Sequence, residues 1–159
     1  MSELNSLKGR AFGQFSSCET QRPDSTDPIE IKITDQEDMF GGKHTIDFVQ
    51  RDIEIKTTGM YLIMAAPQIG KTSGDQARWI DFWLRTNNVD IPNSNVRAVL
   101  KDPCQKDVIV LQVLTRLNEG DTLNIMMSVE KTGEGLGIEA IQPPGEPLVP
   151  SIILTMMQM

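Results

Sequence analysis

Residues 65–72 carry several of the residue types found in a phosphate-binding loop. Gly70, Lys71 and Thr72 would offer backbone N–H groups to phosphate oxygens, an ammonium group to the β/γ charges and a hydroxyl to magnesium. However, Ala65 stands where the motif has its first glycine, and the apolar run 108–114 ends without the aspartate that would hold the metal. Two interpretations follow: a small nucleotide-binding enzyme that uses Gly70, Lys71 and Thr72, or a strand that ends in a polar turn. We expect the second, and therefore no enzyme and no catalytic residues.

Other reactive side chains are few in this sequence. Its single histidine, His44, cannot form a multi-histidine metal site, and Cys18 and Cys104 lack the C-x-x-C spacing of a metal or redox pair. Five acidic residues could serve as calcium ligands: Asp24, Asp27, Asp35, Glu37 and Asp38. Their spacing matches no calcium loop, so we expect solvated acidic loops and no cofactor.

The overall composition narrows the class of partner. The chain has 159 residues, enough for one domain with its own core, and a net charge of −7. Such an acidic chain has no general affinity for nucleic acid or for anionic membranes, because both need excess Lys and Arg. No apolar run reaches the roughly 20 residues that span a bilayer. The first residues are polar and include Glu3, unlike a secretory signal, so the sequence leaves the location of the protein open.

Alternating apolar and polar residues predict short antiparallel strands. Residues 29–33, 44–49, 52–56 and 122–130 all alternate, with turn-forming residues between them. Residues 60–69 and 107–117 differ because they are apolar on both faces and must be covered on both. In a two-sheet sandwich, only another subunit can cover the outer face. The pattern predicts an all-β, two-sheet antiparallel sandwich.

Residues 75–86 fit either a helix or a strand. As a helix, Trp79, Phe82 and Trp83 have helical spacing. As a strand, the segment turns apolar residues inward, and Asn87-Asn88 follows as a tight turn that tolerates positive φ. The strand would carry four residues on its outer face: Trp79, Asp81, Trp83 and Arg85.

Four stretches resemble the jelly-roll superfamily of tumour necrosis factor and the complement q-subcomponent globular head. They are Gly59-Met60-Tyr61, the segment 81–88 that leads into Asn87-Asn88, Leu117-Asn118-Glu119-Gly120-Asp121, and the apolar segment 151–155. They occur in the family's order and cover about residues 50–159. The absence of a Gly-X-Y stalk favours microbial or viral chains of this shape. We therefore expect a flexible arm at residues 1–9 and a single domain at residues 10–159.

The resemblance implies a compact homotrimer without an inherited catalytic site. The interface residues it implies come from the doubly apolar strands and the last strand: Tyr61, Met64, Ala66, Leu111, Val113, Leu154 and Met156. Alternatively, Met60, Leu62 and Met64 are core residues of a monomer beneath a loop.

The expected function is a binding or structural module of a microbial surface or a virion that recognises a protein or carbohydrate through loops and outer strand faces. The expected binding residues are Trp79, Asp81, Trp83 and Arg85. Alternatively, the N-terminal arm covers both tryptophans with Phe12 and Phe15.

Overall fold

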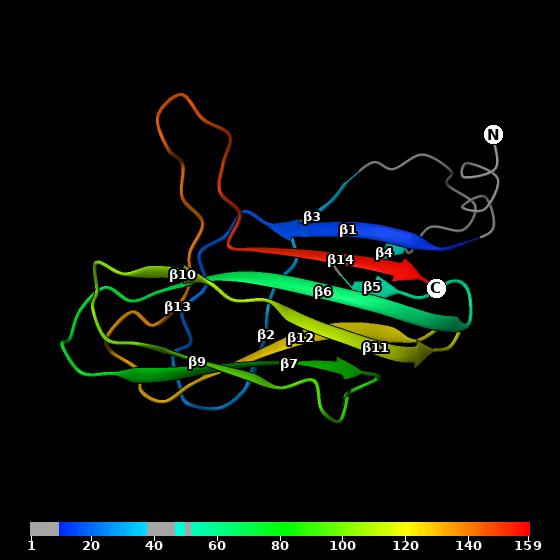
Figure 1. Ribbon diagram of the computed structural model, residues 1–159, viewed down its shortest axis with the longest axis horizontal. Coiled ribbons are helices and arrows are strands. Elements are labelled where there is room, and N and C mark those ends of the chain that lie inside the picture. Colours follow the sequence, from blue (N-terminus) through cyan, green and yellow to red (C-terminus); the bar gives the residue numbers. More distant parts are fainter. Residues whose placement is uncertain (1–9, 38–46, 50–51) are drawn as a thin grey trace.

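Two antiparallel sheets pack face to face in a computed structural model that describes residues 10–37, 47–49 and 52–159 (Figure 1). The β6 sheet contains β1 (Phe12–Ser17), β3 (Asp35–Gln36), β6 (Gly59–Gly70), β10 (Lys106–Val108), β11 (Leu111–Leu117), β13 (Gly137–Ile138) and β14 (Ile152–Gln158). The β7 sheet contains β2 (Ile29–Glu30), β4 (Asp47–Val49), β5 (Asp52–Glu54), β7 (Arg78–Thr86), β8 (Val89–Asp90), β9 (Val96–Leu100) and β12 (Thr122–Val129). The predicted all-β sandwich is therefore confirmed, while the predicted arm at residues 1–9 lies outside the described residues.

The described residues form no helix, and hence none that is long and apolar enough to cross a membrane. Residues 75–86, which fitted a helix or a strand, contain β7. Asn87 and Asn88 have φ of 50° and 64°, as the predicted tight turn requires, and they join β7 to β8.

β6 is the central strand of its sheet. One of its edges pairs with β11 and then β10, and the other pairs with β14 and then β13. β14 in turn pairs with β1 along the whole of β1, which brings Phe12 opposite Met157. The first and last described strands therefore lie side by side (Figure 1).

The alternation of side chains along β6 separates the core from the outer face. Tyr61, Ile63, Ala65 and Ile69 are at most 1 % exposed and join the core, whereas Met60 and Met64 are 49 % and 41 % exposed. The core continues on the facing sheet with Ile80, Phe82 and Leu84 of β7 and Leu123, Ile125 and Met127 of β12. The strand predicted at residues 60–69 thus has the two apolar faces expected of it.

The strand predicted at 107–117 is divided into β10 and β11. The division lies opposite Pro67 of β6, which lacks the N–H that a continuous ladder would need. At this point the Ile109 N–H donates to the Pro67 carbonyl, at 3.3 Å. Pro67 therefore explains why an apolar run that looks continuous in sequence forms two strands.

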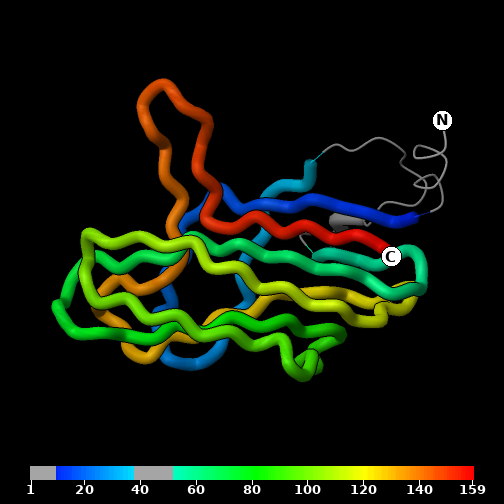
Figure 2. Tube along the Cα trace, viewed as in Figure 1, coloured from blue at the N-terminus to red at the C-terminus, as the bar shows by residue number. Residues whose placement is uncertain are grey.

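The connection between β13 and β14 leaves the sandwich. Residues 142–148, which we call the proline arm, project away from both sheets as a narrow loop (orange in Figure 2). At its base, Ile141 and Val149 exchange two backbone hydrogen bonds, at 2.9 and 2.8 Å.

Candidate functional site

Trp79, Asp81, Trp83 and Arg85 lie on one face because they alternate with the buried residues of β7. This face is the outer surface of the β7 sheet. β12 and β9 flank β7, so outward side chains of all three strands are neighbours: Asn124 stands opposite Arg85, Ser128 opposite Asp81 and Val99 opposite Trp79. The outward orientation predicted for the four residues is therefore correct.

Arg97 of β9 connects Asp81 and Trp79. Its Nε and one terminal nitrogen donate to the two carboxylate oxygens of Asp81, at 2.7 and 2.9 Å. Its guanidinium carbon lies 4.1 Å from the centroid of the Trp79 ring, which is cation–π geometry. The hydrogen bonds that Arg97 donates to Asp81 raise the pKa of Arg97 above its ordinary value. Arg97 therefore links the Trp79 ring and the Asp81 carboxylate on the outer surface of the β7 sheet.

Asp90 of β8 connects Trp83 and Arg85. The indole Nε1 of Trp83 and the Nε of Arg85 both donate to Oδ1 of Asp90, at 2.8 and 2.9 Å. The hydrogen bond from Trp83 and the one from Arg85 hold the pKa of Asp90 below its ordinary value. Sequence reasoning missed both Asp90 and Arg97. The Asn87-Asn88 turn was the signal that could have found Asp90, because it places Asp90 opposite Arg85.

A polar hollow of about 360 Å³ lies beside this face, and no sequence pattern predicted it. It forms where β2 and β5 pair with the same edge of β12, one beyond the other, next to the β7–β8 turn. Carboxylates, amides and a hydroxyl line it: Glu30, Asp52, Asn87, Asn88, Thr122 and Asn124. Within the described chain, the side chains of Glu30, Asp52, Asn88 and Asn124 have no hydrogen-bond partner. These groups are therefore available to a ligand.

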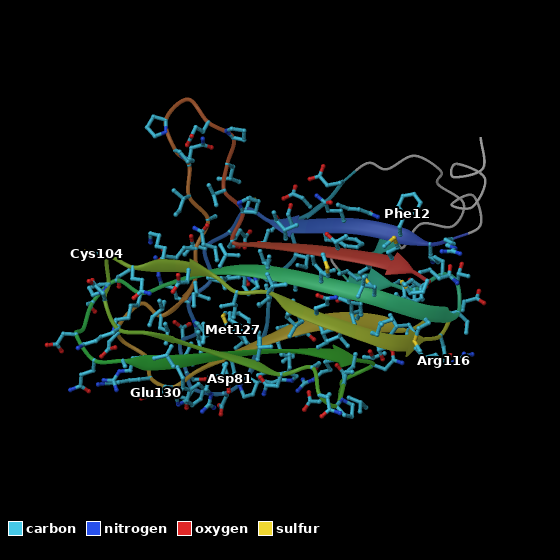
Figure 3. All side chains as sticks on the ribbon, in the orientation of Figure 1. Phe12, Asp81, Cys104, Arg116, Met127 and Glu130 are labelled. Atoms are coloured by element: carbon cyan, nitrogen blue, oxygen red, sulfur yellow. The ribbon has the colours of Figure 1, made fainter. Side chains whose placement is uncertain are left out.

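Phe12 and Phe15 do not cover Trp79 and Trp83. Phe15 is fully buried in the core, and Phe12 belongs to β1 in the other sheet. Figure 3 shows Phe12 and Asp81 on different sheets of the sandwich. The interpretation that Phe12 and Phe15 shield Trp79 and Trp83 is therefore wrong, because β1 pairs with β14 and not with the β7 sheet.

Gly70, Lys71 and Thr72 do not form a phosphate cradle. The Lys71 side chain is buried, donates 2.8 Å to the Gln76 carbonyl, and lies 3.5 Å from the Glu134 carboxylate. The N–H groups of Thr72 and Ser73 both donate to the Glu134 carbonyl, at 2.8 and 3.1 Å. The ammonium and amides that a nucleotide would need are thus already bonded within the protein. The phosphate-loop interpretation has no support.

Arg78 completes this partly buried cluster. Its Nε and one terminal nitrogen donate to the Glu134 carboxylate, both at 3.1 Å, and its other terminal nitrogen donates to Glu130 at 3.2 Å. The hydrogen bond from Arg78 lowers the pKa of Glu134, and the charge of Lys71 adds to the effect. The segment that resembled a catalytic motif is therefore a structural ion cluster that attaches residues 71–73 to residues 130–134.

Apolar side chains are exposed on the outer face of the β6 sheet. Met64 of β6 is 41 % exposed, and the large apolar residues that share this face are similarly exposed: Met60, Leu114, Ile153 and Met157. Leu62 stands directly between Leu114 and Met157 in the strand register. Polar side chains share this face, because Gln112 and Thr155 stand opposite Met64 and Arg116 stands opposite Met60. A group of exposed apolar side chains with polar neighbours marks a contact site in soluble proteins. We call it the apolar face.

The interface residues implied by the resemblance divide between this face and the core. Met64 and Ala66 lie on the apolar face, as expected. Tyr61, Leu111, Leu154 and Met156 are fully buried between the sheets, and Val113 packs against the same core. Placing these five at a subunit interface is therefore a mistake of strand phase: in a strand, adjacent residues point to opposite faces, and these five have the inward parity.

The acidic residues considered as calcium ligands are exposed where the structure describes them, and Asp38 lies outside the described residues. No group of three or more His, Cys, Asp or Glu side chains that could hold a metal occurs in the described part of the chain.

Comparison with known proteins identifies the fold. Neither a protein-family model nor a curated protein matches the sequence. Among solved structures, the chain is similar to Eiger TNF from S. frugiperda, with a TM-score of 0.58, 12% identity, and 95% of this chain and 93% of that chain covered. The fold is the tumour necrosis factor-like jelly roll. The TNF-like sandwich has two contrasting outer faces. The β6 sheet carries the apolar face, and the β7 sheet carries Trp79 and Trp83 together with charged residues.

Proposed function

We propose that this TNF-like domain is a non-enzymatic homotrimer that binds a carbohydrate. The observation that carries the proposal is the contrast between the two outer faces. The apolar face would be buried between subunits, and the face of the β7 sheet would remain open to solvent.

The apolar face supports self-association. Met60, Met64, Leu114, Ile153 and Met157 come from three adjacent strands and share one outer face, where Gln112, Thr155 and Arg116 are their polar neighbours. Each large apolar side chain removed from water contributes about 1.5–3 kcal/mol. Homotrimers are typical of the TNF-like fold, and the apolar face gives this chain a surface suited to one.

The face of the β7 sheet supports ligand binding. Trp79 and Trp83 provide rings on which the apolar side of a sugar can stack. Arg97, itself bonded to Asp81, contacts the Trp79 ring, and Asp90 accepts a hydrogen bond from Trp83. The adjoining hollow offers carboxylate, amide and hydroxyl groups suited to sugar hydroxyls. The size of the hollow falls at the lower end of small-ligand sites. Together these features favour a carbohydrate over a protein ligand.

The assembly is tested with Met64→Glu and Leu114→Glu, and Val99→Glu serves as the matched control because Val99 is exposed on the other sheet. Size-exclusion chromatography with light scattering should give a trimer for the wild type and Val99→Glu, and a folded monomer for both apolar-face variants. A wild-type monomer would contradict the proposed assembly.

The ligand is tested separately on a glycan array. Binding should be lost in Trp83→Ala and Asn124→Ala and retained in Met64→Glu at matched protein concentration. An array without any wild-type binding, combined with capture of a purified protein partner through the same face, would replace the carbohydrate proposal with a protein ligand.

A further inference from the structure

The proline arm is a hydrogen-bonded loop. The Glu146 N–H donates to the Pro143 carbonyl at 3.4 Å, and Gly145 has φ of 73°. Proline at the second position and glycine at positive φ in the third are the signature of a type II turn. The Gln142 amide adds a brace, because its Nε2 donates to the carbonyls of both Pro143 and Glu146, at 3.0 and 2.9 Å.

This order is obtained almost without burial. From Pro144 to Leu148 every residue is exposed, and the hydrogen bonds of residues 142–148 with described residues stay within the arm. Fixing a residue costs about 1–2 kcal/mol of backbone entropy, and a lone two-stranded hairpin is marginal in water. Three prolines reduce that cost by restricting the unfolded chain. An exposed loop that already has one conformation is suited to docking, because it loses little conformational entropy when a partner binds.

The turn also excludes one kind of partner. Pro144, Pro147 and Pro150 recur every third residue, as in polyproline II ligands of aromatic grooves. Gly145 lies between the first two prolines at φ of 73°, which a polyproline II helix cannot contain. The arm therefore presents a turn and not an extended proline helix.

We propose that the proline arm clasps a second copy of this chain, which rests on the homotrimer proposed above. The arm runs through Pro150 and Ser151 into β14, whose outward residues Ile153 and Met157 belong to the apolar face. It also projects beyond the β1–β3 side of the same sheet (Figures 1 and 2). A copy docked on the apolar face would therefore meet an arm that continues directly from the buried strand.

The dimensions fit this role. Each limb of the arm has about four residues beyond the Ile141–Val149 pair, a reach of roughly 13 Å at about 3.3 Å per residue. That exceeds the spacing of about 10 Å between packed sheets, so the arm can overlie the edge of a neighbouring sandwich. Leu148, 38 % exposed, is the large apolar side chain that would anchor it.

The first experiment removes the arm. Asn-Gly replaces residues 142–148, which is feasible because Ile141 and Val149 already form the hydrogen-bonded pair that flanks a two-residue hairpin loop. A second variant, Gly145→Val, keeps the length but disfavours the positive φ, and Glu146→Gln is the control that leaves the turn intact. Analytical ultracentrifugation should show half-dissociation at a concentration at least about tenfold higher for the deletion, an intermediate shift for Gly145→Val, and no shift for Glu146→Gln.

The second experiment records the contact itself. The photocrosslinking residue p-benzoylphenylalanine at position 148 should yield covalent dimers on irradiation, and the same residue at position 99, on the opposite sheet, should not.

The proposal requires both results. A deletion variant that associates like the wild type, or a position-148 variant that gives no covalent dimer, overturns the clasp while the trimer through the apolar face stands. A wild type that is monomeric at every concentration overturns both. If the deletion variant is unfolded by circular dichroism, Gly145→Val decides in its place.

Discussion

The guanidinium carbon of Arg97 lies 4.1 Å from the centroid of the Trp79 ring, and the same guanidinium donates two hydrogen bonds to the Asp81 carboxylate. One arginine thus fixes both an aromatic surface and an acidic group of the same face. A flat ring held in this way loses little further freedom when a ligand stacks on it.

Removing Arg97 should therefore expose Trp79 to water. In a Trp83→Phe background, where Trp79 is the remaining tryptophan, Arg97→Gln should shift the fluorescence maximum to longer wavelength. Arg116→Gln, on the other sheet, should leave the spectrum unchanged. An unaltered spectrum in Arg97→Gln would show that the stack does not order Trp79.

Lys71 should contribute to stability and not to nucleotide binding. Lys71→Ala removes a buried cation from Glu134 and leaves the Gln76 carbonyl without its donor, which should cost about 2–4 kcal/mol in urea unfolding. The exposed Lys101→Ala is the control and should cost almost nothing. Magnesium-ATP should leave the melting temperature of the wild type unchanged; a rise that Lys71→Ala abolishes would restore the phosphate-loop interpretation.

Acid should weaken the ion cluster at Glu134. Because Arg78 and Lys71 lower the pKa of Glu134 in the folded state, its stabilising effect is complete above its unfolded pKa of about 4.3. The effect is lost as pH falls through the lower folded-state value. Stability measured by urea unfolding should therefore fall below about pH 4, and Glu134→Gln should flatten that slope. The same slope in wild type and Glu134→Gln would remove Glu134 as its cause, and Glu146→Gln should retain the slope.

Substitutions at two adjacent residues of β14 should have different effects, one on folding stability and the other on association. Leu154 is fully buried, so Leu154→Ala should cost about 2–5 kcal/mol of unfolding free energy. Ile153 is 38 % exposed on the apolar face, so Ile153→Ala should leave the stability of the monomer nearly unchanged and weaken association. Chemical unfolding and ultracentrifugation distinguish the two effects. Equal losses of stability in both variants would contradict the assignment of faces.

The sequence predicted the sandwich well because its signals are local. Alternation in residues 122–130 and the Asn87-Asn88 turn each depend on neighbours in the chain, and both are confirmed. The two-sided apolar character of β6 also follows from local pattern. The direction of individual side chains could not be predicted as well, because a strand that is apolar on both faces does not reveal which face points inward. Tyr61 and Leu154 were expected at a subunit interface, and both side chains point into the core.

The candidate binding surface could be predicted only in part. The outward residues of β7 could be predicted from one strand, but Arg97 reaches Asp81 from β9, and Asp90 acts through its pairing with Arg85. The polar hollow depends on β2 and β5 sharing one edge of β12. Such relationships arise from strand pairing over long sequence distances, which no local pattern contains.

The pairing of β1 with β14 also has a consequence for how the chain folds. β1 also pairs with β3 over two residues, but β14 is its partner along its whole length, and β14 must complete its ladder with β6 as well. Sheets closed by such distant contacts fold slowly, because the loop entropy is lost before the contacts form. A chain emerging from the ribosome therefore holds β6 and β1 without their shared neighbour until β14 is made. We expect slow, late closure of this sheet, with the apolar face at risk of aggregation until then.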